Sequence, residues 1–203
     1  IGDSAGKVIT TGTHNTLIGG LAGDALTDAD FNTAVGLSAL TTDTLGSRST
    51  ALGYQALNTQ NFTTATDTYN TAVGFNAGVA VTTGIRNTLI GGLAGDSYTD
   101  ADYNVAVGMF VLGSDTLGSR STGMGYGALQ TQNFTTATNS YNVGVGYDAG
   151  AAVTTGIQNV LIGAQAGDVL TDADFNVALG TVALSSDTLG SRSTALGHAA
   201  LYS

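Results

Sequence analysis

The chain has 203 residues, of which 30 are Gly and none is Pro, Cys or Trp. Fifteen acidic residues, all of them Asp, stand against five basic ones, and the formal net charge is −10. This charge excludes nucleic acid as a natural partner, because phosphate binding needs clustered Lys and Arg. No stretch is long and apolar enough to cross a bilayer, so the sequence predicts no membrane insertion.

A nine-residue phrase returns along the chain, as in "NTAVGLSAL" at 32–40 and "STALGYQAL" at 49–57. The spacings between copies run 17, 17, 21 and 17 residues and then repeat, which makes a four-copy unit of 72 residues with four extra residues in one copy. Each copy predicts a short strand at its second to fourth positions. The eleven copies begin at Asn15, Asn32, Ser49, Asn70, Asn87, Asn104, Ser121, Asn142, Asn159, Asn176 and Ser193.

The phrase predicts an all-β fold, a parallel β-solenoid (β-roll) of 17- and 21-residue coils. Its second and fourth residues are β-branched or apolar and fall on one face of a strand, while the third, usually Ala, falls on the other. Gly at this density disfavours a helix, and repeats that cannot bury a face alone stack as coils. The invariant fifth residue predicts a column of tight turns: Gly19, Gly36, Gly53, Gly74, Gly91, Gly108, Gly125, Gly146, Gly163, Gly180 and Gly197.

The repeat predicts a single solenoid segment over residues 1–203. We divide it into a partial super-repeat at roughly 1–14, complete ones at 15–86 and 87–158, and a partial one at 159–203. Because both ends fall inside a coil and neither has a cap, we expect an uncapped fragment of a longer fibre.

Two apolar strand faces predict two packing surfaces. We expect the Val, Ile and Leu of the fourth position to fill the coil, and the small row at the third position (Ala34, Ala51, Ala72 and their equivalents) to pack closely against other chains. This arrangement predicts a homotrimer. The alternative is that the Ala row fills the interior of a thin coil.

The phrase N-[TV]-[AL]-[VIL]-G-x-x-A-[GL] resembles the repeats of bacteriophage tail-fibre and tailspike shafts. It is also similar to the head repeats of trimeric autotransporter adhesins, whose shorter coils carry an N-S-V-A-I-G phrase in a left-handed parallel β-roll. The resemblance implies a trimeric fibre that lies outside the cell, on a virion or on a bacterial surface.

The expected function is therefore structural: a shaft or head segment of a trimeric viral tail fibre in the virion, involved in host attachment. The alternative is the head of a bacterial surface adhesin. An ice-binding solenoid is a third hypothesis, because Thr16, Thr33, Thr50, Thr71 and Thr88 form a regular row. Val replaces Thr at 105, 143, 160 and 177, which is typical of a buried row instead.

The sequence predicts no catalytic residues and no enzymatic activity. Cys and Glu are absent, and His14 and His198 lie far apart along the stack. The sequence therefore offers few residues that could act as a catalytic acid, base or nucleophile. The "TDAD" turns resemble the start of a calcium loop, but the Gly and the late Glu of that loop are missing, which favours plain turns. The candidate calcium ligands are Asp28, Asp30, Asn32, Asp100, Asp102, Asn104, Asp172, Asp174 and Asn176; no other cofactor is expected.

The four extra residues of the longer coils predict two outward protrusions, because the interior of a solenoid is fixed by the neighbouring coils. Tyr69 and Tyr141 are expected to fold back over the coil. A local or interchain ion pair is expected between Asp43 and Arg48 and between their equivalents. The polar residues of the protrusions are the candidates for binding a host glycan or protein: Gln60, Asn61, Thr63, Gln132, Asn133 and Thr135.

Overall fold

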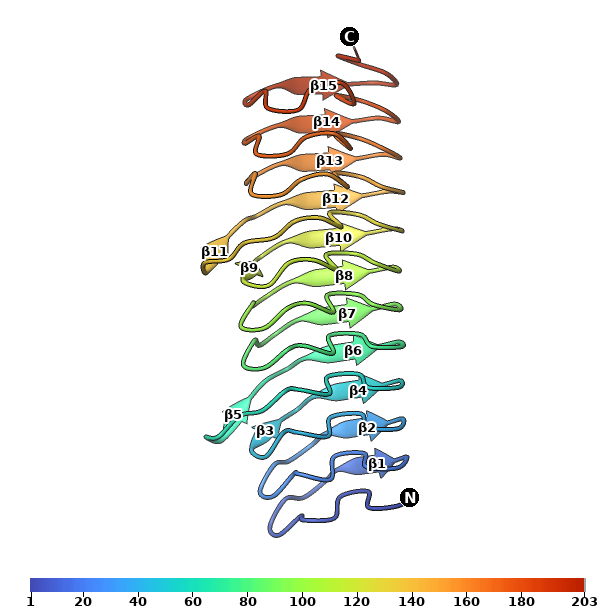
Figure 1. Ribbon diagram of the computed structural model, residues 1–203, viewed down its shortest axis with the longest axis vertical. Helices are drawn as coiled ribbons and strands as arrows, with labels where there is room; N and C mark the ends of the chain where they lie inside the picture. The colour runs from blue at the N-terminus through green and yellow to red at the C-terminus, as the bar shows by residue number, and fades with distance from the viewer. Residues whose placement is uncertain (203) are drawn as a thin grey trace.

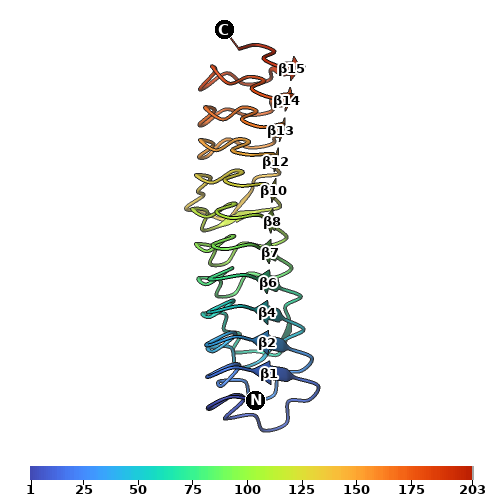
Figure 2. The ribbon, with the colours of Figure 1, turned by 90° about the vertical axis from the view of Figure 1, so that its right-hand side faces the viewer.

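Residues 1–202 are described by the structure, a computed structural model, and they form a solenoid of stacked coils (Figure 1). Eleven short strands make one sheet, and all pairings in it are parallel. Figure 2 shows the strands along one side of a single column of coils. The predicted all-β parallel solenoid is confirmed. In spatial order the strands are β1 (Thr16–Ile18), β2 (Thr33–Val35), β4 (Thr50–Leu52), β6 (Thr71–Val73), β7 (Thr88–Ile90), β8 (Val105–Val107), β10 (Thr122–Met124), β12 (Val143–Val145), β13 (Val160–Ile162), β14 (Val177–Leu179) and β15 (Thr194–Leu196).

The register of the sheet follows the nine-residue repeat. Each strand residue pairs with the same phrase position of the next copy, for example Thr16 with Thr33. This also holds across a longer coil, where Thr50 pairs with Thr71. A slip of one residue would turn every side chain to the opposite face, so the four extra residues must leave the coil without disturbing the strand.

The third position of the phrase lines the interior, and the fourth position faces outward. Ala34 and Ala106 are fully buried, whereas Ile18 and Met124 are 42% and 43% exposed. The expectation that Val, Ile and Leu fill the coil while Ala packs against another chain is therefore wrong, and the alternative of a thin Ala-lined interior is right. Further buried Ala and Leu side chains, such as Ala39 and Leu40, occupy the rest of that interior.

The exceptions in the Ala row are explained by size matching inside the coil. Leu89 and Leu161 stand at the third position and are fully buried. Six residues later these coils carry Gly95 and Gly167, where a Cβ atom would approach the Leu side chain within 2.8 Å. Coils with Ala at the third position mostly carry Leu six residues later instead. In these coils a large side chain at one position is matched by a small residue at the other, as close packing requires.

A ladder of Asn side chains closes the corner before each strand. The Asn32 backbone N–H donates to Asn15 Oδ1 at 2.9 Å, and the Ser49 N–H donates to Asn32 Oδ1 at 2.8 Å. The Asn32 amide in turn donates to the Gly46 carbonyl at 2.9 Å. Asn104 makes the same contacts in the next unit. Because these groups are buried, the ladder satisfies polar atoms that would otherwise destabilise the fold.

The longer coils begin where Ser replaces Asn in the ladder, at Ser49 and Ser121. Gln60 stands one coil after Asp43, at the same position of the repeat. Its Nε2 donates to Ser49 Oγ at 2.8 Å and to Asp43 Oδ2, and its Oε1 accepts from Asn70 Nδ2 at 2.8 Å. Gln132 repeats the contacts with Ser121, Asp115 and Asn142. The glutamine amide thereby bridges the interruption of the Asn ladder.

Two short side sheets mark the longer coils. One pairs β3 (Gly46–Ser47) with β5 (Thr66–Asp67), and the other pairs β9 (Gly118–Ser119) with β11 (Thr138–Asn139). Figure 1 shows β5 and β11 standing out from the column on the same side. The two predicted protrusions are thus present.

Candidate functional site: three outward surfaces

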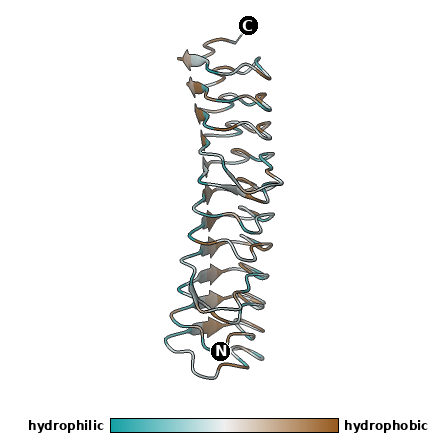
Figure 3. Ribbon diagram, turned by 90° about the vertical axis from the view of Figure 1, so that its left-hand side faces the viewer, coloured by the Kyte–Doolittle hydropathy of each residue, from teal (hydrophilic) through white to brown (hydrophobic). Residues whose placement is uncertain are grey.

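The first surface is the sheet face, formed by the outward second and fourth positions of all eleven strands. No hydrogen bond joins the hydroxyl of a second-position Thr to another protein group within residues 1–202. The strands carry neutral to apolar colours along the molecule in Figure 3. This face is uncharged and repeats at about 4.8 Å per strand. Its fourth-position residues are Ile18, Val35, Leu52, Val73, Ile90, Val107, Met124, Val145, Ile162, Leu179 and Leu196.

The second surface, the aromatic edge, follows the glycine turn at the end of the strands. Tyr54 stacks on Phe75 with ring centroids 5.3 Å apart, and Tyr126 stacks on Tyr147 at 5.5 Å. These side chains are about half exposed, and they continue the apolar character of the sheet face. The aromatic edge consists of Leu37, Tyr54, Phe75, Met109, Tyr126 and Tyr147.

The third surface, the Arg ladder, precedes the Asn corner at the beginning of the strands. It has one residue per coil, and in every one of them the backbone φ is positive, between 52° and 65°. Its middle part alternates aromatic and Arg side chains, with guanidinium carbons 4.8 to 6.0 Å from the ring centroids. The Arg ladder consists of His14, Phe31, Arg48, Tyr69, Arg86, Tyr103, Arg120, Tyr141, Gln158, Phe175 and Arg192.

The predicted calcium ligands point in different directions. Asp28 accepts a hydrogen bond from the Thr11 hydroxyl and Asp30 accepts two from Thr13, whereas Asn32 is buried in the Asn ladder. Asp100 and Asp102 serve the preceding coil in the same way. No group of three or more His, Cys, Asp or Glu side chains in residues 1–202 is placed to hold a metal ion. Their observed contacts are those of coil-to-coil turns.

The candidate receptor residues divide into two groups. Gln60 and Gln132 are fully buried, so the prediction that they bind a ligand at the surface is wrong, since their amides are needed inside the coil. Thr63 and Thr135 are exposed on the protrusions, as is Asn133, while Asn61 is partly covered and accepts from the Thr44 hydroxyl at 3.2 Å.

The aromatic residues of the protrusions behave in the opposite way to the prediction. Phe62 and Phe134 fold back and are 8% and 6% exposed. Tyr69 and Tyr141 are about half exposed and belong to the Arg ladder. Sequence reasoning missed this ladder, although its residues stand directly before every Asn or Ser that opens a phrase.

The expected Asp43–Arg48 ion pair is not formed. Asp43 is buried beside Gln60, and Arg48 Nε instead contacts Asp67 Oδ1 at 2.9 Å. Burial raises the pKa of Asp115, the counterpart of Asp43, although donors from Gln132 and the backbone oppose this shift.

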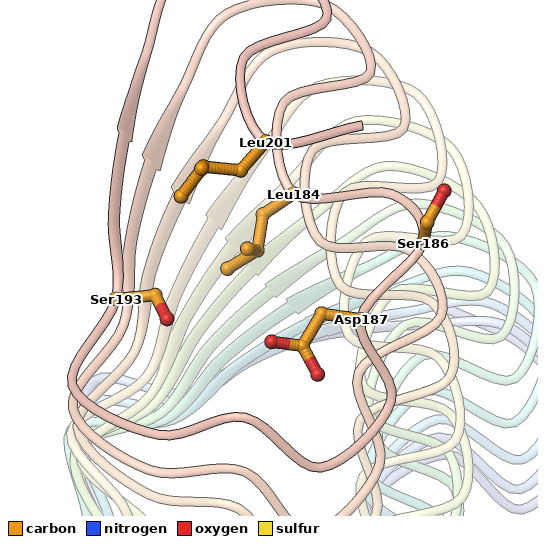
Figure 4. A pocket seen from close by; sticks show the side chains of 5 residues that line it. All are labelled: Leu184, Ser186, Asp187, Ser193 and Leu201. Atoms are coloured by element: carbon orange, nitrogen blue, oxygen red, sulfur yellow. The ribbon is translucent and has the colours of Figure 1, made fainter. Parts of the chain in front are cut away.

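A pocket of about 390 Å³ lies in the last coil. Figure 4 shows Leu184, Asp187, Ser193 and Leu201 pointing into the coil interior, whereas Ser186 points away. Asp187 and Ser193 are the counterparts of Asp115 and Ser121, which hold Gln132 in the preceding unit. The pocket therefore occupies the place that Gln132 fills one unit earlier, and its Asp and Ser are the counterparts of structural residues.

No protein-family model, curated protein or solved structure matches this chain. Among residues 1–202, no helix is long and apolar enough to cross a membrane.

Proposed function

We propose that this chain is a rigid segment of a homotrimeric fibre, a shaft or head of the viral tail-fibre type that takes part in host attachment. The observation that supports this function most directly is the outward sheet face. It presents an unbroken column of Val, Ile, Leu and Met over eleven strands, and the aromatic edge extends it along much of the rod.

The occupant of this face is a second copy of the same chain. A monomer rarely exposes a contiguous apolar patch of more than a few hundred Å², and these two surfaces run over most of the rod. Copies of one rod share the same strand spacing, so their side chains match along the whole contact. Packing the sheet face of one copy against the aromatic edge of the next is a heterologous contact, and three such contacts close a ring.

The first prediction concerns this assembly. The purified chain should sediment as a species three times its 20.2 kDa mass. Replacing Ile90 and Met124 by Glu should yield monomers, because an apolar interface does not accept unpaired charges. The control carries Glu at Thr63 and Thr135, which lie on the protrusions, and should remain trimeric.

Circular dichroism on both double variants shows whether the coils are intact. A wild-type monomer at micromolar concentration contradicts the proposal, and so does a trimer that persists in folded Ile90→Glu/Met124→Glu protein.

Ice binding is the second candidate, because the Thr row lies on the outward face. The sequence-based argument that this row is buried is wrong, since Thr16 and Thr194 are exposed and the other second-position residues are at least partly so. A regular array of Thr and Val at strand spacing is a surface that could order water. Thermal hysteresis in a monomeric sample supports this candidate, and a trimer without thermal hysteresis excludes it, because one face cannot serve both functions.

A further inference from the structure

The Arg ladder gathers almost all of the positive charge of an acidic protein. Four of the five basic residues stand in this single column, and only Lys7 lies elsewhere. Three of them follow one another at every second coil: Arg48, Arg86 and Arg120. With a strand spacing of about 4.8 Å, neighbouring guanidinium groups are therefore roughly 9.6 Å apart along the rod.

Arg120 is held by three side chains. Its guanidinium carbon lies 4.8 Å from the ring centroid of Tyr103 and 6.0 Å from that of Tyr141. Its Nε donates to Asn139 Oδ1 at 2.9 Å. The side chain of Tyr103 is 40% exposed and that of Tyr141 is 49% exposed. A guanidinium confined between two rings keeps its N–H groups in the plane between them, so the donors at its tip face outward.

The tip of Arg120 has no partner in the protein. Within residues 1–202 no hydrogen bond joins its terminal nitrogens to another group, and no carboxylate lies within ion-pair distance. Arg86, two coils away, directs one terminal nitrogen to the Tyr103 hydroxyl. Asp102 is the acidic residue near both Arg86 and Arg120. It forms an ion pair with neither, and its Oδ1 accepts a hydrogen bond from the Ile85 backbone N–H at 2.7 Å.

The equivalent Arg of the preceding unit is already neutralised. Arg48 makes an ion pair with Asp67, and Asn139 is the residue that takes the place of Asp67 one unit later. The chain therefore contains the same Arg site twice. In the first copy Asp67 supplies a carboxylate partner for Arg48, and in the second copy Arg120 has no carboxylate partner. A guanidinium that is oriented but lacks a carboxylate is suited to bidentate recognition of an external acid group.

We propose that Arg120 and Arg86, oriented by Tyr69, Tyr103, Tyr141 and Asn139, bind the sulfate or carboxylate groups of a linear acidic polysaccharide. The distance between the two guanidinium groups matches a polymer that carries one acid group per disaccharide and lies along the rod. The Asp residues on the rest of the surface repel such a polymer, which favours its binding at this ladder and makes that binding sensitive to salt. The inference goes beyond the fibre function and does not depend on how many copies assemble.

The test uses the full chain, with dextran sulfate as the probe and uncharged dextran as its control. Binding is measured by calorimetry at low salt. We expect dextran sulfate to bind and dextran not to. Arg120→Gln should weaken binding about tenfold or more, in keeping with the loss of a charge-assisted hydrogen bond. Asn139→Asp should weaken it similarly, because it supplies the internal carboxylate found beside Arg48.

The reciprocal change, Asp67→Asn, should strengthen binding by freeing Arg48. Thr135→Ala, on the same protrusion, is the matched control and should leave binding unchanged. Melting temperature and sedimentation of each variant separate this outcome from unfolding or altered assembly. The proposal is overturned if wild type binds both polymers alike, if Asn139→Asp binds as wild type does, or if inorganic sulfate at equal charge competes as well as the polymer does.

Discussion

Gly91 and Gly92 are neighbours in the chain but have different surroundings. Gly91 has a φ of 133°, and a Cβ atom there would overlap the backbone carbonyl of Gly108 in the next coil. At Gly92 the nearest atom to such a Cβ is Met109 Cγ at 4.0 Å, and the same position is Ala164 one unit later. Only the first of the two glycines is therefore required by the backbone.

We predict that Gly91→Ala destabilises the protein by about 3 kcal/mol or more, since backbone strain and overlap with a neighbouring coil add together. Gly92→Ala should be within about 0.5 kcal/mol of wild type, as is usual for exposed substitutions. Urea unfolding followed by circular dichroism measures both. Equal stability of the two variants contradicts the assigned role of the glycine column.

At the residue scale, the sequence predicted which positions are constrained but not which side of the strand is interior. Both faces of the strand are apolar, so alternation alone does not distinguish them. The deciding feature is the correlation between Leu89 and Gly95, or between Ala34 and Leu40, six residues apart. Such pairs reveal which positions share one interior.

At the scale of a coil, the long loop stabilises the fold from inside. Gln60→Ala removes a donor to Asp43 and Ser49 and an acceptor for Asn70, all of them buried. We predict a loss of about 2–4 kcal/mol, since an unsatisfied buried polar group costs about 1–3 kcal/mol and more when charged. Thr63→Ala, in the same loop, is the control and should be close to neutral.

Thermal or urea unfolding of both loop variants provides the measurement, and equal stability of Gln60→Ala and wild type refutes the bridging role.

The spacing of the repeats predicted where the loops lie and that they protrude. It did not predict that Gln60 turns inward, because that depends on Ser49 interrupting the Asn ladder. The presence of Ser only in coils of this class was the available signal.

For the whole molecule, the net negative charge and the burial of carboxyl groups both make the fold more stable at lower pH. Burial raises the pKa of Asp96, Asp102 and Asp115 above the ordinary value of 3.8. The folded chain therefore binds protons at a higher pH than the unfolded chain does. The stability linked to these groups is fully present below their unfolded pKa and is lost as the pH rises through the folded values. Hydrogen bonds from Thr13 lower the pKa of the partly exposed Asp30. The stability linked to Asp30 is therefore lost only as the pH falls below 3.8.

We predict that the melting temperature is higher at pH 4.0, close to the ordinary carboxyl pKa of 3.8, than at pH 7.5. Each 1 kcal/mol gained raises the melting temperature by roughly 2–4 °C in a chain of this size. Repulsion among the 15 Asp residues also declines at the lower pH. High salt separates the two causes, because it screens exposed charges but leaves the desolvation of buried carboxyls in place. A rise that survives NaCl at about 0.5 M, roughly three times physiological ionic strength, assigns the effect to the buried carboxyls. A lower melting temperature at pH 4.0 than at pH 7.5 contradicts the prediction in either solvent.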